Sequence, residues 1–269
     1  YLNIPIRELK LQTHPLAGFP LTRPLGQTVE RAAIHFNGVS KRFGKVSVLE
    51  NVELRVREGE FLGLVGINGA GKTTLIKCLL DLCAPSSGSI DIFGLPHSQP
   101  ASRSRLAFLP EQFIPPNFAT GNEFLRFMAA MHRQPWQLNN IEPTLHTLDL
   151  DPMALRKPVR HLSKGTAQKL GLAATLLSGK DLYVLDEPMS GLDPKARVLF
   201  KRDLLARKRQ GLTLFFTSHM LADISTLCDR MAVLHQGQIL YQGAPAAFCE
   251  HFGATEIEGA YLNCVGATP

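Results

Sequence analysis

Residues 66–74, GINGAGKTT, constrain this chain more than any other segment. They match the phosphate-binding loop pattern G-x-x-x-x-G-K-[ST] at every fixed position. Glycine tolerates backbone angles that a side chain would forbid, so successive N–H groups can point into one concavity and hold phosphate oxygens. The loop residues predicted to contact a nucleotide are Gly66, Asn68, Gly69, Ala70, Gly71, Lys72, Thr73 and Thr74. The segment therefore predicts a chain that binds nucleoside phosphates.

The flanks of this loop occur in the order that phosphate binding requires. Residues 61–65, FLGLV, are typical of a buried strand, and Leu75 and Leu79 lie at helical spacing after the loop. The helix N-terminus then presents the positive end of its dipole to the phosphates. Lys72 adds a point charge, and the Thr73 hydroxyl is placed to ligate Mg²⁺. An incidental glycine-rich turn would not need this strand and this helix around it.

Two adjacent carboxylates follow a second hydrophobic segment, residues 182–185. Asp186 and Glu187 therefore fall at the carboxyl edge of the predicted sheet, where open α/β sheets bind their ligands. Asp186 suits the Mg²⁺ shell, and Glu187 suits activation of an attacking water. Two acids after a buried strand can also be surface residues that open a loop. The phosphate loop upstream favours the catalytic interpretation.

Composition limits the class of protein. The chain has 269 residues, of which 45% are hydrophobic, enough for a real core in one large domain or two modest ones. Its five cysteines form no C-x-x-C pair, which argues against a zinc site and a disulfide scaffold and favours a reducing, cytoplasmic location. No apolar run approaches the roughly 20 residues of a membrane-spanning helix, and no signal segment is evident. We therefore expect a chain that neither crosses a membrane nor is secreted.

The net charge of +6 fits a nucleic-acid ligand, an anionic membrane surface or simply a cationic protein. Basic residues are spread along the chain, with one dense cluster over residues 195–209. That cluster lies on a predicted helix whose apolar stripe includes Ala196, Phe200 and Leu204. A solvated outer face is the favoured interpretation of the cluster.

The chain divides into three parts by pattern. Residues 1–30 carry four prolines and little periodicity, which predicts an N-terminal extension, and residues 249–269 form a weakly patterned C-terminal tail. Between them, residues 31–248 alternate strand and helix signals as a parallel sheet with covering helices does. Strand signals are absent from about 111–165, which predicts a helical subdomain. Strands are expected over residues 33–36, 46–56, 61–65, 182–185 and 212–217, with a hairpin over 231–241.

With its motifs in this order, the chain resembles the nucleotide-binding subunit of an ATP-binding cassette (ABC) transporter. The motifs cover about residues 43–219, with matching flanks to about residue 243. The resemblance implies an α/β fold: a P-loop NTPase (RecA-like) core with an N-terminal antiparallel β lobe and a helical subdomain insert. It also implies ATP and Mg²⁺ as cofactors and ATP hydrolysis as the reaction.

The resemblance assigns roles to residues on the dimer interface. The family signature, usually Leu-Ser-Gly-Gly-Gln, contacts the γ-phosphate held by the opposing subunit, and residues 162–166, LSKGT, occupy its place. Ser163 and Gly165 match, whereas Lys164 and Thr166 depart; Lys164 adds charge compatible with phosphate. Ser163 also reads as the N-cap of a helix. Asp193 lies in the segment that resembles the D-loop, which crosses the interface, and it also reads as an N-cap before Pro194.

Three further positions take roles from the resemblance. His219 matches the switch histidine that senses the γ-phosphate, and Phe43 fills the place of the aromatic residue that stacks on adenine. The glutamine of the lid loop, which meets Mg²⁺ and the catalytic water, falls within residues 109–112. Gln112 is favoured for this role, and Glu111 is the alternative.

By resemblance, two subunits sandwich two ATP–Mg²⁺, and hydrolysis releases the pair. The implied partners are a transmembrane permease subunit and a second ATPase subunit, identical or different, which places the chain peripherally on the cytoplasmic face of the inner membrane. The residues that make up several of these motifs resemble those of exporters more than those of importers, which favours an exporter. Four phenylalanines of the helical insert are either apolar anchors for the permease or that subdomain's own core: Phe113, Phe118, Phe124 and Phe127.

The sequence is also compatible with two other functions. A soluble ABC ATPase acting on ribosomes or nucleic acid is one, but such proteins commonly carry two cassettes, whereas this chain has a single phosphate loop. We therefore expect no nucleic-acid partner. The other is an ATP-binding adaptor with weak hydrolysis, which the departures at Lys164 and Thr166 allow. The motifs do not identify the cargo.

Overall fold

The computed structural model describes residues 31–266, so the predicted N-terminal extension lies outside the described residues. A four-stranded antiparallel sheet comes first, in the spatial order β2-β1-β4-β5. Its strands are β1 (Ala32–Phe43), β2 (Val46–Arg57), β4 (Ser87–Ile92) and β5 (Leu95–Pro96). Gly44, with φ of 57°, makes the tight turn between β1 and β2. This sheet is the predicted β lobe, to which the structure adds β4 and β5.

The second sheet has six strands in the order β10-β9-β3-β8-β7-β6, and only β10 runs antiparallel to its neighbour. The strands are β3 (Phe61–Val65), β6 (Leu106–Leu109), β7 (Leu182–Leu185), β8 (Thr213–Ser218), β9 (Arg230–His235) and β10 (Gln238–Gly243). Every residue of β3, β7 and β8 is buried, as the continuous apolar runs of a sheet covered on both faces require. The predicted α/β class is confirmed.

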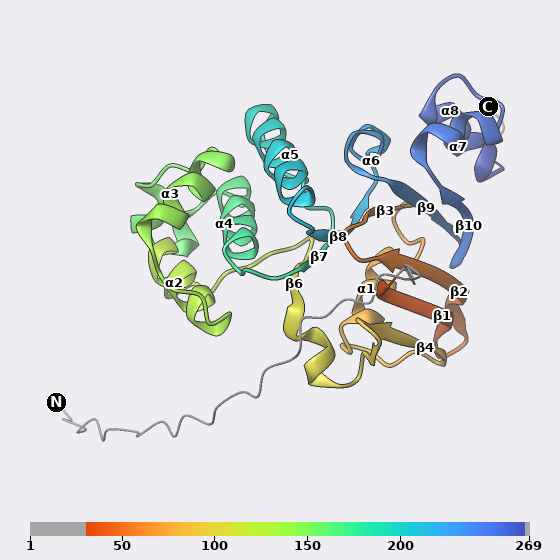
Figure 1. Ribbon diagram of the computed structural model, residues 1–269, viewed down its shortest axis with the longest axis horizontal. Coiled ribbons are helices and arrows are strands. Elements are labelled where there is room, and N and C mark those ends of the chain that lie inside the picture. The colour runs from red at the N-terminus through yellow and green to blue at the C-terminus, as the bar shows by residue number, and fades with distance from the viewer. Residues whose placement is uncertain (1–30, 267–269) are drawn as a thin grey trace, which may run out of the picture.

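Helices cover this sheet and extend from it (Figure 1). They are α1 (Lys72–Leu79), α2 (Gly121–Met131), α3 (Leu138–Thr147), α4 (Lys164–Leu176), α5 (Pro194–Lys208), α6 (Leu221–Leu227), α7 (Pro245–His251) and α8 (Ile257–Cys264). Short 3₁₀ turns span Pro100–Arg105, Ala154–Arg156 and Val159–His161. Helices α2, α3 and α4 gather at one end of the molecule, and β1, β2 and β4 lie at the other. Within residues 31–266, no helix combines the length and the apolar character needed to cross a bilayer.

Two apolar cores hold the layers together. One joins β1, β2, β4 and α1 to one face of the six-stranded sheet, through residues such as Phe36, Leu75 and Phe215. The other joins the opposite face to the remaining helices and includes Phe61 and Phe216. Neighbouring residues 215 and 216 point to opposite cores because side chains alternate along a strand. The sheet between the cores carries the cleft at its carboxyl edge.

Two regions differ from expectation. The weakly patterned tail contains helix α8, whose Ala260 is fully buried, and α8 packs on α6 and α7. The basic cluster of α5 is not simply solvated, because most of its charges pair with acids of other elements or of α5 itself. The pairs are Lys195–Asp149, Arg197–Asp223, Lys201–Asp223, Arg207–Asp203 and Lys208–Asp229, at 2.6–2.7 Å. Periodicity alone could not reveal these acids, since most lie far away in the sequence.

Candidate functional site

The phosphate loop joins β3 to α1, and its glycines are required by the space around them. A Cβ on Gly66 would lie 2.4 Å from the Leu234 carbonyl oxygen. Gly71, the N-cap of α1, has φ of 111°, and a Cβ there would lie 2.8 Å from Leu49 Cδ2. Larger residues would push β9 and β2 away from the loop. The loop therefore keeps its curl only with glycine at these positions.

Lys72 folds back onto this loop. Its Nζ donates to the Gly66 carbonyl oxygen at 2.6 Å and to the Ile67 carbonyl oxygen at 3.3 Å. The same nitrogen lies 3.8 Å from Glu187 Oε1, and both side chains are less than 10% exposed. The lysine thus places a positive charge between the loop backbone and the carboxylate at the end of β7.

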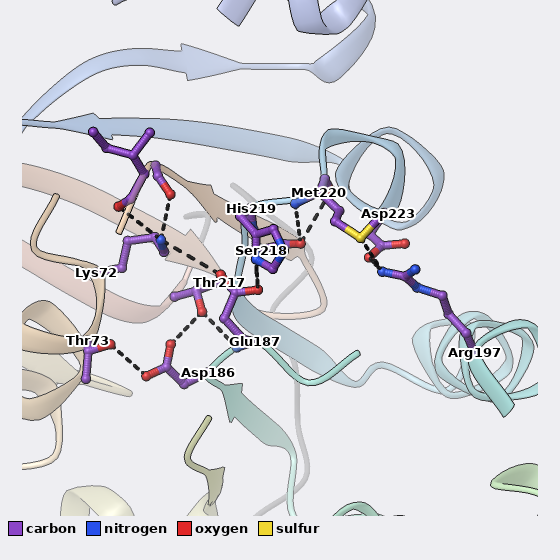
Figure 2. Close-up of polar contacts among 12 residues, drawn as sticks. Lys72, Thr73, Asp186, Glu187, Arg197, Thr217, Ser218, His219, Met220 and Asp223 are labelled. Carbon is purple, nitrogen blue, oxygen red and sulfur yellow. Dashed lines mark hydrogen bonds and ion pairs between the residues drawn. The ribbon is translucent and has the colours of Figure 1, made fainter. Parts of the chain in front are cut away.

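Asp186 lies directly opposite the start of α1 (Figure 2). Its Oδ2 accepts from the Thr73 hydroxyl at 2.9 Å, and its Oδ1 accepts from the Thr217 hydroxyl at 2.6 Å. The Asp186 residue is 2% exposed. A hydroxyl and a carboxylate oxygen side by side are the hard oxygen ligands that Mg²⁺ takes in nucleotide sites. Thr73 and Asp186 therefore fit a magnesium ion.

Thr217, which sequence reasoning missed, organises both carboxylates. Besides its bond to Asp186, its hydroxyl oxygen accepts from the Glu187 N–H at 2.9 Å. The only signal in the sequence is a hydroxyl residue near the carboxyl end of a predicted strand. Its function emerges only because β8 pairs with β7 and brings the two strand ends together.

Glu187 is the most constrained residue of the site. Its φ is +48°, a conformation that costs a non-glycine residue on the order of 1–3 kcal/mol and that clusters at functional sites. Its Oε2 lies 2.9 Å from His219 Nδ1. Its Oε1 is buried without a hydrogen-bond partner among the described residues. A buried carboxylate oxygen left without a donor is suited to accept from a bound water.

His219 stands at the end of β8, and its side chain is 59% exposed. An ionised carboxylate only accepts hydrogen bonds, so with Glu187 ionised the Nδ1 atom that faces it carries a proton. The other ring nitrogen, Nε2, is then the one available to a ligand. The structure brings His219 and Glu187 together, and the roles of both residues stay predictions.

The loop, Asp186 and Glu187 line an open cleft of about 390 Å³, whereas Thr217 and His219 are not among its lining residues. The lining residues are Val48, Ile67, Asn68, Gly69, Gly71, Lys72, Thr73, Thr74, Glu111, Asp186 and Glu187. Glu111 is among them and Gln112 is not, and the assignment of either residue to the lid loop stays a prediction. Phe43 lies outside the lining at the end of β1, 52% exposed, with Lys41 Nζ 4.8 Å from its ring centre. Its predicted stacking role stays a prediction.

The predicted signature lies apart from this cleft. Ser163 caps α4, since its Oγ accepts from the Thr166 N–H at 3.1 Å. A Cβ on Gly165 would lie 2.9 Å from the Gly191 carbonyl oxygen, so α4 packs closely on the D-loop segment. Neither Lys164 nor its two neighbours are among the described residues that line the cleft. Their predicted contact with a nucleotide is therefore not made at the cleft of their own chain and stays a prediction.

Asp193 ties the D-loop segment to α4. Its Oδ1 accepts from the Ala196 N–H at 2.9 Å, and its Oδ2 lies 2.7 Å from Lys169 Nζ. The N–H of Ala196, and then Lys169, lower the pKa of the Asp193 carboxyl to about 2. The N-cap interpretation of Asp193 is confirmed by this geometry.

The four phenylalanines of the helical insert separate into two pairs. Phe124 is buried, and its ring centre lies 5.6 Å from that of Phe113. Phe118 is 89% exposed and Phe127 is 58% exposed. Two therefore belong to the subdomain's core, and two stay candidates for contact with a partner.

Comparison with known proteins agrees with this geometry. The family model described as ABC transporter matches residues 49–190. An uncharacterised ABC transporter ATP-binding protein of Synechocystis is 37% identical over 209 residues, covering 75% of this chain and 58% of the relative. A Nod factor export ATP-binding protein I of Burkholderia lata is 36% identical over 225 residues, covering 81% of this chain and 73% of the relative.

Solved structures give the same fold. An ATP-binding subunit of an ABC transporter superposes with a TM-score of 0.76 at 28% identity, covering 86% of this chain and 99% of that one. A dimeric ATP-binding cassette in a post-hydrolysis state with ADP and Pi superposes with a TM-score of 0.71 at 21% identity, over 78% of this chain and 98% of that one. The chain spans about three fifths of the length of the first two curated relatives it matches.

Proposed function

The chain belongs to the ABC transporter family, and we propose that it is an ATP-binding and ATP-hydrolysing subunit that drives a membrane partner. The observation that carries this proposal is the arrangement of Glu187. Its carboxylate lies beside the loop lysine and the His219 ring, and its buried Oε1 accepts no hydrogen bond from the described residues. A site that only bound nucleotide would not need such a carboxylate.

Binding is assigned to the loop and to α1. The amides of the glycine-rich loop and the N-terminus of α1 face the phosphates, and Lys72 Nζ exchanges its carbonyl partners for phosphate oxygens. Thr73 and Asp186 would hold Mg²⁺, which neutralises charge on the phosphates when bound. Thr217 keeps Asp186 oriented toward Thr73 throughout.

The proton chemistry is assigned to Glu187 and His219. Glu187 Oε1 accepts a hydrogen bond from the attacking water and draws its proton away, while Oε2 stays bonded to His219 Nδ1. His219 orients the carboxylate on one side and faces the terminal phosphate with its other nitrogen. Mutation of a correctly placed general base lowers the rate of hydrolysis by a factor on the order of 10²–10⁴.

Completion of the site is assigned to a second copy or a similar subunit. Ser163, Lys164 and Gly165 would reach the terminal phosphate across the interface, which explains their distance from the chain's own cleft. Closure would follow ATP binding, because the closed pair binds the triphosphate better than the open one. The other partner would be a transmembrane permease subunit, with this chain on the cytoplasmic face of the membrane. Relatives that serve Nod factor export favour export as the direction.

The experiment is to measure ATP binding and turnover of the purified chain, alone and with any membrane protein that co-purifies. We expect Glu187→Gln to bind ATP as the wild type does while losing at least about 100-fold in kcat. Glu256→Gln, an exposed carboxylate at the N-cap of α8, is the matched control and should hydrolyse normally. An assembled complex without turnover would leave only the adaptor function. Turnover that RNA or DNA stimulates, with steep salt dependence, would point to the soluble alternative.

A further inference from the structure

A second polar cluster lies beside the cleft, between α5 and α6 (Figure 2). Its centre is Asp223, in the first turn of α6, whose side chain is only 3% exposed. Arg197 Nη2 lies 2.7 Å from Asp223 Oδ2, and Lys201 Nζ lies 2.6 Å from Oδ1. Both oxygens of a buried carboxylate are therefore bound by cations of α5.

Arg197 also reaches the loop that carries the histidine. The same Nη2 atom lies 2.8 Å from Met220 Sδ, and Met220 is both the residue after His219 and the N-cap of α6. Before the histidine, the Ser218 hydroxyl oxygen accepts from the Met220 N–H at 3.0 Å. His219 thus stands on a short loop that is held by β8 at one end and by Arg197 at the other.

The histidine ring has little else to hold it. Because its side chain is 59% exposed, packing does not set its direction. The direction depends on the loop backbone and on the bond from Nδ1 to Glu187 Oε2. A loop that shifted would therefore break the contact between His219 and Glu187 without changing the phosphate loop.

We infer that Arg197 is a positioning residue for His219. By binding Met220 and Asp223 together, it keeps the imidazole in hydrogen-bond contact with Glu187. Arg197 also lies one helical turn after Asp193, the cap of α5 in the D-loop segment. A displacement of the D-loop at a subunit interface would therefore reach the histidine through one turn of α5. This inference rests on the proposed ATPase function for its kinetic test.

The test compares three variants of the full chain. Arg197→Met removes the contacts to both Asp223 and Met220. Lys201→Met is the matched control, because it removes a cation from the same carboxylate but leaves the contact between Arg197 and Met220 in place. Arg197→Lys keeps a charged nitrogen that can donate to both acceptors. Unfolding temperature and the Kd for ATP are measured for each variant beside kcat.

We expect Arg197→Met to lower kcat by roughly 10- to 100-fold with the Kd for ATP changed by less than about twofold, since a small misplacement of a catalytic group has such an effect. Lys201→Met should keep kcat within about twofold of wild type, and Arg197→Lys should lose much less kcat than Arg197→Met because its ammonium can still donate to both acceptors. Equal values of kcat for Arg197→Met and Lys201→Met would overturn the inference. If Arg197→Met does not fold, Met220→Leu replaces it: a lower kcat supports the inference, and an unchanged kcat overturns it.

A second readout does not depend on turnover. In ¹⁵N NMR of the imidazoles, with His219 assigned by comparison with His219→Gln, the Nδ1 signal should move towards that of a free ring in Arg197→Met and stay in place in Lys201→Met. An unmoved signal in Arg197→Met would contradict the inference. A wild-type chain without ATP turnover but with the expected NMR shift would remove the proposed function and keep this positioning role.

Discussion

Gly69 and Gly71 both adopt positive φ, at 86° and 111°, yet they differ in what surrounds them. No heavy atom lies within 4 Å of a Cβ built on Gly69. A Cβ on Gly71 would meet Leu49 Cδ2 at 2.8 Å and the Val48 carbonyl oxygen at 2.9 Å. A larger residue would therefore be strained by its backbone angles at both positions, but it would also collide with neighbouring atoms at Gly71.

The two alanine variants separate these effects. We expect Gly69→Ala to lower the free energy of unfolding by about 1–2 kcal/mol, the cost of a left-handed conformation for a residue with a Cβ. Gly71→Ala should lose at least about 1 kcal/mol more, because β2 must move. Urea unfolding without nucleotide measures both. Equal losses of unfolding free energy in the two variants would show that β2 can move away from residue 71 at no cost.

The lowered pKa of Asp193 predicts that the free energy of unfolding depends on pH. Its folded pKa of about 2 lies below the value of about 3.9 for an unfolded aspartate, so its bonds stabilise the fold fully above about pH 4. That stabilisation is lost as the pH falls through 3.9 towards 2. In acid unfolding, the difference in stability between wild type and Asp193→Asn should therefore shrink over this window. A constant difference from pH 5 to pH 2 would contradict the assignment.

At the scale of elements, helix α2 has two faces with separate tasks. Its N-terminus is a capping box, in which Thr120 and Glu123 bond each other's backbone N–H. Phe124 then enters the core of the subdomain, whereas Phe127, one turn later, is exposed. The same helix therefore holds the subdomain together through Phe124 and exposes the side chain of Phe127.

Truncating each phenylalanine distinguishes these tasks. Phe124→Ala should lower the free energy of unfolding by about 3–5 kcal/mol, because it opens a cavity beside Phe113. Phe127→Ala should change it by less than about 0.5 kcal/mol. If Phe127 contacts a permease, its variant should instead weaken co-purification of the membrane subunit. Similar stability losses for both variants would contradict the division.

For the whole molecule, the decisive feature is that the predicted signature and the phosphate loop belong to different surfaces. The cleft is lined by the loop, by Glu111 and by the end of β7, whereas Ser163 caps α4 beside the D-loop. Under the proposed function, a complete site takes the loop from one subunit and the signature from a second copy or a similar subunit. Hydrolysis would then be a property of the pair.

Mixing two inactive variants tests this arrangement. Lys72→Ala and Ser163→Arg chains should each be inactive, but a mixed pair holds one complete site. Up to about a quarter of wild-type turnover should return, because half of random pairs are mixed and each carries one of two sites. Mixing Lys72→Ala with Glu187→Gln is the control, since both residues belong to the same half-site and no complete site forms. Absence of recovery in the first mixture would refute sites shared between chains.

Local pattern was enough to predict part of this molecule. The phosphate loop, the strand before it and the carboxylates after residues 182–185 stand where predicted, because each depends on a few neighbouring residues. Helix α8 and strands β4 and β6 were not anticipated, since their short segments carry weak periodicity.

The spacing of residues within short windows was enough to predict the α/β class and the family, because such spacing encodes strand, turn and helix. Three other features depend on the folded chain: Thr217 bonds both Asp186 and Glu187, Arg197 reaches Met220, and most of the charges of α5 are paired. Except for the pair Arg207–Asp203, these contacts join residues 21 or more positions apart. They exist only once strand pairing and helix packing bring those residues within hydrogen-bond distance.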